Sequence, residues 1–190
     1  KGNKLGLAKK AYNFIGGIIN SAEALTALFN PTINSYRRID APTTTSGATW
    51  SPSNISYSGN NRTHMIRVPE PGRFELRLMD GSVNPYLLQA GIIAAGKDGM
   101  ERKSDPGEPL NINMYTESDN YPNLKKLPSD LETALKYLSE NKVMNESFGP
   151  SNIKSYIKLR QKELKEFNSD NSFSKKNPIT DWEKDNTLDC

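Results

Sequence analysis

The first thirty residues carry a helical pattern of apolar side chains. These side chains recur mostly three or four positions apart, which predicts one long helix over residues 4–29. Gly16 and Gly17 lie inside this helix. Glycine weakens a helix, but the missing side chains also permit close approach of another backbone. The helix should end where Pro31 follows, because proline disfavours the helical conformation at the residue before it.

A strict alternation of polar and apolar side chains over residues 73–78 predicts a β-strand. Residues 63–68 predict a partner strand, with the turn at 69–72. The apolar face of the second strand comprises Phe74, Leu76 and Leu78, and its polar face comprises Arg73, Glu75 and Arg77. We therefore expect an antiparallel pair with one face against a core.

The remaining patterns predict mainly helices and loops. Asn84, followed by proline, should cap a helix that runs to about residue 95 and is nearly all apolar, hence buried. Ser129 lies three residues before a glutamate, the spacing of a capping box. The pattern over residues 151–167 predicts an amphipathic helix. Trp182 is expected to anchor the polar C-terminal segment to the rest of the domain. Residues 30–61 read as an irregular, loop-rich region. The fold class predicted is α+β, with largely antiparallel strands covered by helices.

Composition narrows the class of protein. The chain has 190 residues and a net charge of +3, and its positive charges lie mostly in mixed lysine–glutamate segments. A nucleic-acid partner is not expected, because no dense basic stripe is interleaved with aromatics. No apolar run approaches the ~20 residues of a membrane helix. The single cysteine, Cys190, predicts a reducing compartment, so a cytoplasmic protein is expected.

The polar face around Glu75 is the first candidate for chemistry. One interpretation is a solvated ion-pair ladder on an antiparallel sheet, and the triplet alone favours it. The other is a site for a metal and an anion, in which Glu75 offers a hard oxygen ligand and the flanking arginines neutralise the anion.

Further arginines near this strand shift the balance toward an anion site. Arg38, Arg62 and Arg67 precede it, whereas lysines dominate elsewhere. Arginine binds carboxylate and phosphate through a planar fork that lysine lacks. A spacing of five would place Arg62 and Arg67 on opposite faces of one strand, so they share a ligand only if Arg62 lies on the preceding loop. His64, between them, is interpreted as a half-buried strand histidine without a catalytic role.

These residues form motifs that resemble the C-terminal catalytic region of glutamine synthetases. The matching segments are Asn30-Pro31-Thr32-Ile33-Asn34-Ser35-Tyr36-Arg37-Arg38, Asn61-Arg62-Thr63, Arg67, Arg73-Phe74-Glu75-Leu76-Arg77, Asn84-Pro85-Tyr86-Leu87 and the ending Thr180-Asp181-Trp182-Glu183. The resemblance implies the C-terminal portion of that catalytic domain. Residues 1–125 would carry the ATP and glutamate motifs, and residues 126–190 a helical subregion and tail of the same domain.

The resemblance implies a ligase that joins ammonia to the γ-carboxylate of glutamate at the expense of ATP, with Mg²⁺ or Mn²⁺ bound. Arg38 would bind the glutamate carboxylate, Arg62 and Arg67 the ATP phosphates, and Arg73 would lie along the nucleotide. Glu75 would be a metal ligand, and Arg77 would contact glutamate or the transferring phosphoryl group. In the family, adjacent identical subunits of a ring complete each site, and further metal ligands would precede residue 1. The 190-residue chain alone is therefore expected to be inactive.

One departure concerns the amine. A family loop that ends in a glutamate is shortened here, and Asp40 would have to replace that glutamate as the group that helps deprotonate ammonium. Ammonia is the first choice of acceptor, and methylamine or another alkylamine is the alternative. A relative without catalysis that binds nucleotide or only assembles is a third hypothesis. Tyr115 lies where some members carry a modified tyrosine, but a packed or exposed loop aromatic explains it at least as well.

Overall fold

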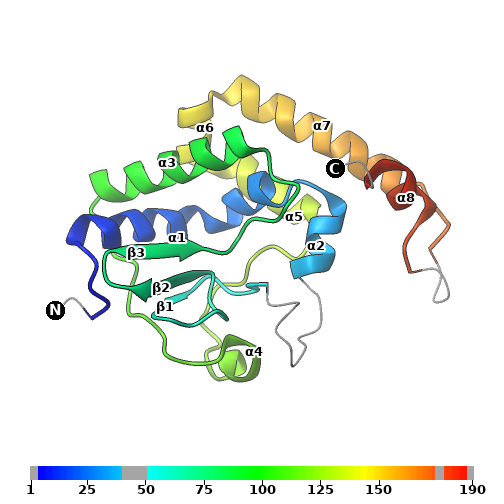
Figure 1. The fold of residues 1–190 in the computed structure, drawn as a ribbon. Coiled ribbons are helices and arrows are strands. Elements are labelled where there is room, and N and C mark those ends of the chain that lie inside the picture. The colour runs from blue at the N-terminus through cyan, green and yellow to red at the C-terminus, as the bar shows by residue number, and fades with distance from the viewer. Residues whose placement is uncertain (1–3, 40–50, 174–177, 188–190) are drawn as a thin grey trace.

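The structure is a computed structural model that describes residues 4–39, 51–173 and 178–187. In chain order the elements are α1 (Lys9–Phe29), α2 (Ile33–Ile39), β1 (Tyr57–Ser58), β2 (Ile66–Glu70), β3 (Arg73–Leu76), α3 (Pro85–Glu101), α4 (Met114–Glu117), a 3₁₀ turn (Ser118–Asn120), α5 (Leu131–Glu140), α6 (Lys142–Phe148), α7 (Pro150–Asn168) and α8 (Asp181–Thr187). Helices α1 and α3 lie on one side of a small sheet and the short α4 on the other (Figure 1), which confirms the α+β class. Within the ranges described, no helix has the length and apolarity needed to span a bilayer.

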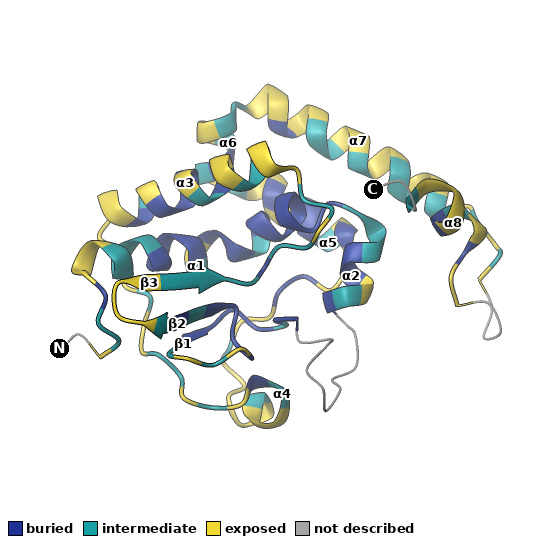
Figure 2. Ribbon diagram, viewed as in Figure 1, coloured by how far each residue is buried: buried dark blue, intermediate teal, exposed yellow. Residues whose placement is uncertain are grey.

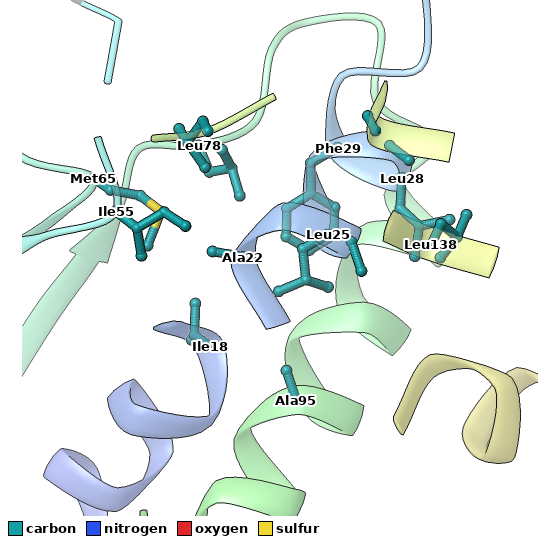
Figure 3. Packing of buried hydrophobic residues seen from close by; sticks show 14 of the residues in the cluster. Ile18, Ala22, Leu25, Leu28, Phe29, Ile55, Met65, Leu78, Ala95 and Leu138 are labelled. Atoms are coloured by element: carbon teal, nitrogen blue, oxygen red, sulfur yellow. The ribbon is translucent and has the colours of Figure 1, made fainter. Parts of the chain in front are cut away.

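Helix α1 is the centre of the core and lies between the sheet and α3 (Figure 1). Figure 3 shows Ile18 and Ala22 of α1 on the side of Ile55 and Met65, which come from the sheet region. At the other end of α1, Phe29 is fully buried. The helix starts at Lys9 and not at residue 4 as predicted, because Gly6 adopts a left-handed φ of 70° that ends helical geometry.

Helices α1 and α3 cross with their backbones in close contact, as the glycine pair predicted. A Cβ on Gly17 would lie 2.0 Å from the carbonyl oxygen of Ala95. On the partner helix, a Cβ on Gly99 would lie 2.3 Å from the carbonyl oxygen of Asn13. No side chain fits at either position, so the glycines set the distance between the two helices.

The sheet has the order β1-β2-β3. Strands β2 and β3 pair antiparallel, with Arg67 opposite Glu75 and Glu70 opposite Arg73, which confirms the predicted pair. Strand β1 adds to β2 in parallel. This strand and α2 both lie in the region predicted to be irregular, where two to seven residues give too short a pattern to detect.

The helix predicted over 86–95 is present, but the prediction that it is buried is wrong for its outer face. Helix α3 buries small residues against α1, but Tyr86 is 82% and Ile93 62% exposed. Figure 2 shows this outer face as a yellow stripe along α3. Only the face with Gly91 and Ala95 meets α1, so apolar composition alone did not predict which face would be covered.

The C-terminal third is helical, as expected. Asp130, and not Ser129, caps α5, since its carboxylate accepts a hydrogen bond of 2.7 Å from the amide of Thr133. Helix α7 covers the predicted residues 151–167. Trp182 packs edge-on against Phe167 of α7 at 5.7 Å, which confirms its role as an anchor.

Candidate functional site

The pairing of β2 with β3 places Glu75 between two arginines. Its carboxylate lies 3.0 Å from Nη1 of Arg67 and 3.4 Å from Nε of Arg77. The arginine side chains are 15% and 17% exposed, against 38% for Glu75. Partly buried charges attract more strongly than fully solvated ones, and each arginine contacts a different oxygen of the carboxylate through one nitrogen. This geometry differs from that of a fully solvated ion-pair ladder.

Arg38 extends the group from a different element. It lies in the last turn of α2, and its Nη2 donates to the carbonyl oxygen of Leu78 at 2.8 Å and to Oδ1 of Asn30 at 3.0 Å. Burial lowers the pKa of the Arg38 guanidinium, while the carboxylate of Asp80 opposes that change and Arg77 adds to it. A guanidinium remains charged through the physiological range, so Arg38 brings a partly buried cation close to Arg77, which directly follows β3.

Arg62 and Arg67 line one surface hollow of about 420 Å³. Strand β2 begins at Ile66, so Arg62 lies in the turn before it, which is the arrangement that a shared ligand requires. Four polar residues complete the lining, namely Asn60, Asn61, Thr63 and Asn113. Forked donors and amide groups around an open hollow suit an anion such as phosphate.

Two of the predicted site residues are not part of this group. Arg73 lies at the start of β3, where it forms an exposed ion pair of 3.0 Å with Glu70 across the turn. Its predicted place along the nucleotide stays a prediction. Asp40, predicted to act on the amine, lies outside the residues that the structure describes.

Sequence analysis did not predict that asparagines would hydrogen-bond the arginines of the candidate site. Oδ1 of Asn60 accepts a hydrogen bond from Nε of Arg67 at 2.9 Å, and Oδ1 of Asn30 accepts one from Nη2 of Arg38 at 3.0 Å. The amide side chain of Asn61 donates to the carbonyl oxygen of Ile112 at 2.8 Å, which joins the hollow to the segment before α4. The Asn60-Asn61 pair next to an arginine was visible in the sequence, but its partners are distant along the chain.

His64 lies in the turn before β2 and is fully buried, so the interpretation as a half-buried strand residue is wrong. Its Nε2 lies 3.0 Å from the carbonyl oxygen of Ile112 and its Nδ1 3.0 Å from Oγ of Ser56. A carbonyl only accepts, so Nε2 carries the proton and Nδ1 accepts from the serine hydroxyl. Nearby, Tyr115 lies in the short helix α4 and not in a loop, and its hydroxyl donates to the carbonyl oxygen of Ser51 at 2.9 Å.

We expect His64 to make stability depend on pH. Burial lowers its pKa, although the hydrogen bond to the Ile112 carbonyl opposes that change. Below the unfolded-state value near 6.5, the unfolded chain takes up a proton that the folded chain resists. The free energy of unfolding should therefore fall as the pH is lowered from about 6.5 to about 5. Denaturant titrations across this range measure the slope, and His64→Gln, which keeps a donor and an acceptor, should flatten it.

Glu75 fits one position in the coordination of a hard divalent ion. Its carboxylate is reachable from solvent and has lone pairs beyond those that face the two arginines. Across residues 4–39, 51–173 and 178–187, no group of three or more histidines, cysteines or carboxylates could hold a metal. Glu75 would therefore share such an ion with ligands from elsewhere.

Comparisons with known proteins show which family the chain resembles over nearly its whole length. The family model for the glutamine synthetase catalytic domain matches residues 1–182. The glutamine synthetase of Rhizobium meliloti is 47% identical over 186 residues, which cover 98% of this chain and 41% of the relative. The glutamate–methylamine ligase of Methyloversatilis universalis is 40% identical over 97% of this chain and 40% of its own.

A solved structure of GmaS in complex with ADP superposes over the whole chain and 42% of its own length, with a TM-score of 0.83 and 45% identity. The chain thus spans about 41% of the length of the first relative. It carries the arginine–glutamate arrangement on the fold of these enzymes, and it belongs to the glutamine synthetase family.

Proposed function

We propose that this chain supplies the anion-binding part of an ATP-dependent ligase that joins an amine to the γ-carboxylate of glutamate. The observation that carries the proposal is the carboxylate of Glu75 between Arg67 and Arg77, at 3.0 and 3.4 Å, beside the hollow that Arg62 lines. Two forked cations around a carboxylate match the needs of a polyphosphate with a bound divalent ion.

In the proposed reaction, a γ-carboxylate oxygen of glutamate attacks the γ-phosphorus of ATP and ADP leaves. The amine nitrogen then attacks the acyl carbon, and phosphate departs. Arg62 and Arg67 bind the phosphates of ATP, and Arg77 neutralises charge on the phosphoryl group as it moves. Arg38 binds the glutamate carboxylate, and Arg73 lies along the nucleotide. Asp40 accepts a proton from ammonium.

A divalent ion, Mg²⁺ or Mn²⁺, would be held in part by Glu75. When bound, the ion supplies charge neutralisation for the phosphate oxygens. The described residues offer no full set of ligands, so the proposal requires carboxylates from the rest of the ligase polypeptide or from an adjacent identical subunit of a ring. The 190-residue chain by itself should therefore show no turnover.

Ammonia is the first candidate for the amine, which makes glutamine the product. The match to the Rhizobium meliloti enzyme at 47% identity supports it. Methylamine is the second candidate, because a glutamate–methylamine ligase is 40% identical over nearly the whole chain. A relative that binds nucleotide without turnover is the third.

The test is phosphate release that depends on both ATP and glutamate, measured with ammonia and with methylamine. It is run on the 190-residue chain and on the ligase polypeptide that carries it. We expect turnover by the longer polypeptide only, with a higher kcat/KM for ammonia. Higher kcat/KM for methylamine would assign the second function. Absence of turnover with intact Mg²⁺–ATP binding would assign the third, and turnover by the 190-residue chain would contradict the shared metal site.

A further inference from the structure

Helix α2 connects the candidate site to the C-terminal segment. Arg37 and Arg38 are adjacent in its last turn, so their side chains leave the helix about 100° apart. Arg38 points to the carbonyl of Leu78 beside the site, whereas Arg37 binds Glu183 of α8, 146 positions away along the chain. A helix of seven residues is not stable alone, so its partners determine where it lies.

The contact between Arg37 and Glu183 is a bidentate ion pair. Nε of Arg37 donates to Oε1 of Glu183 at 2.5 Å, and Nη2 donates to Oε2 at 2.8 Å. Glu183 is 1% exposed, whereas Arg37 is 44% exposed. Removal of one partner of such a pair is costly, because it leaves the other charge without compensation.

Glu183 is also fixed within its own helix. Its Oε2 accepts from the amide of Thr180 at 2.8 Å, and its own amide donates to Oγ1 of Thr180 at 3.1 Å. This reciprocal arrangement is a capping box at the start of α8. Trp182, packed on Phe167, holds the same turn against α7. The carboxylate that meets Arg37 therefore has a fixed position.

A second contact joins the same two helices. The side-chain amide of Asn34 donates to Oγ1 of Thr187 at 2.8 Å, one helical turn from the ion pair. Arg37 adds a hydrogen bond of 2.9 Å to the carbonyl oxygen of Pro178. The segment 178–187 thus contacts α2 along its length. These contacts are on a different side of α2 from the side chain of Arg38.

We infer that Glu183 is a positioning residue for glutamate binding: through Arg37 it fixes α2, and thereby the direction in which Arg38 meets the substrate carboxylate. The inference rests on the proposed function. It does not follow from the family motifs, which place Arg38 at the substrate but give no role to the contact between α2 and α8.

The test compares Glu183→Gln with wild type in the ligase polypeptide that carries this chain. Glutamine can keep the capping-box hydrogen bonds but loses the charge that binds Arg37. We expect the KM for glutamate to rise about tenfold, with kcat and the KM for ATP within about twofold. Amide hydrogen exchange should quicken in residues 33–39. The matched control is Asp181→Asn, which breaks an exposed ion pair with Lys184 on the same helix and should change none of these values.

The possible results distinguish different roles for Glu183. If amide hydrogen exchange in α2 is unchanged in the Glu183→Gln variant, the ion pair is not what fixes the position of α2. Faster exchange with an unchanged KM for glutamate would show that α2 does not position Arg38 for the substrate, and equal losses for glutamate and ATP would show a general structural role. Arg37→Lys, which keeps charge but not the fork, should give an intermediate KM. A wild-type protein without ligase activity would instead refute the proposed function.

Discussion

Glu75→Gln should lower kcat for amide formation about a thousandfold, the upper end of the cost of removing one preorganised group from an acyl-transfer site. The substitution keeps the shape of the side chain and removes its charge. Arg67 and Arg77 then face each other without the carboxylate that lies between them at 3.0 and 3.4 Å. In the proposed site, a bound divalent ion would also lose an anionic oxygen ligand.

The same substitution should weaken Mg²⁺–ATP binding by tenfold or more, a typical cost when a metal site is disturbed. Isothermal titration on the ligase polypeptide measures this directly. The midpoint of thermal unfolding should shift little, because the side chain is 38% exposed and the apolar face of β3 is untouched. Loss of activity without loss of stability separates a site from an ion-pair ladder.

Glu70→Gln is the matched control. Glu70 lies on the same pair of strands and also pairs with an arginine, at 3.0 Å, but both side chains are more than half exposed. Exposed pairs of this kind contribute roughly 0–1 kcal/mol. Its kcat and its affinity for Mg²⁺–ATP should stay near the wild-type values. Equal affinity in the Glu75 and Glu70 variants would remove Glu75 from the metal site.

The strands that carry the site were predictable from local pattern. Alternation over 73–78 predicted which residues share a face, and the turn at 69–72 implied an antiparallel partner. The register did not follow, because that turn would place residue 66 opposite Glu75, whereas an irregularity between Arg67 and Glu70 brings Arg67 opposite Glu75. Long apolar periodicity likewise gave α1 and α7 to within a few residues. In these elements the local chemistry and the tertiary structure agree.

What sequence could not give were contacts between distant segments. Arg37 and Glu183 are 146 positions apart, and nothing local marks either as a partner of the other. The burial of α3 was misjudged for the same reason, since its contacts with α1 decide which face of this apolar helix is covered. Asn30 was interpreted as a helix end, although its side chain also holds Arg38. The roles of the arginines toward ligands stay predictions.

Gly17→Ala should destabilise the fold by about 3 kcal/mol or more, at the upper end of what overpacking costs. A methyl group there would lie 2.0 Å from the carbonyl oxygen of Ala95 and 2.8 Å from the backbone of Gly99. Those neighbours are backbone atoms of α3, so they cannot rotate away as a side chain would. The two helices would have to separate, which opens the core around Ile18 and Ala95 (Figure 3).

Intrinsic preference acts in the opposite direction, because alanine favours a helix over glycine by about 1 kcal/mol. A net loss of stability would therefore show that the close approach of α1 and α3 outweighs helix propensity. Gly81→Ala is the control, since a Cβ there meets nothing within 4 Å, and its stability should stay within about 0.5 kcal/mol of wild type. Both variants are compared by denaturant titration. A Gly17→Ala variant as stable as wild type would mean that the crossing is not set by the glycines.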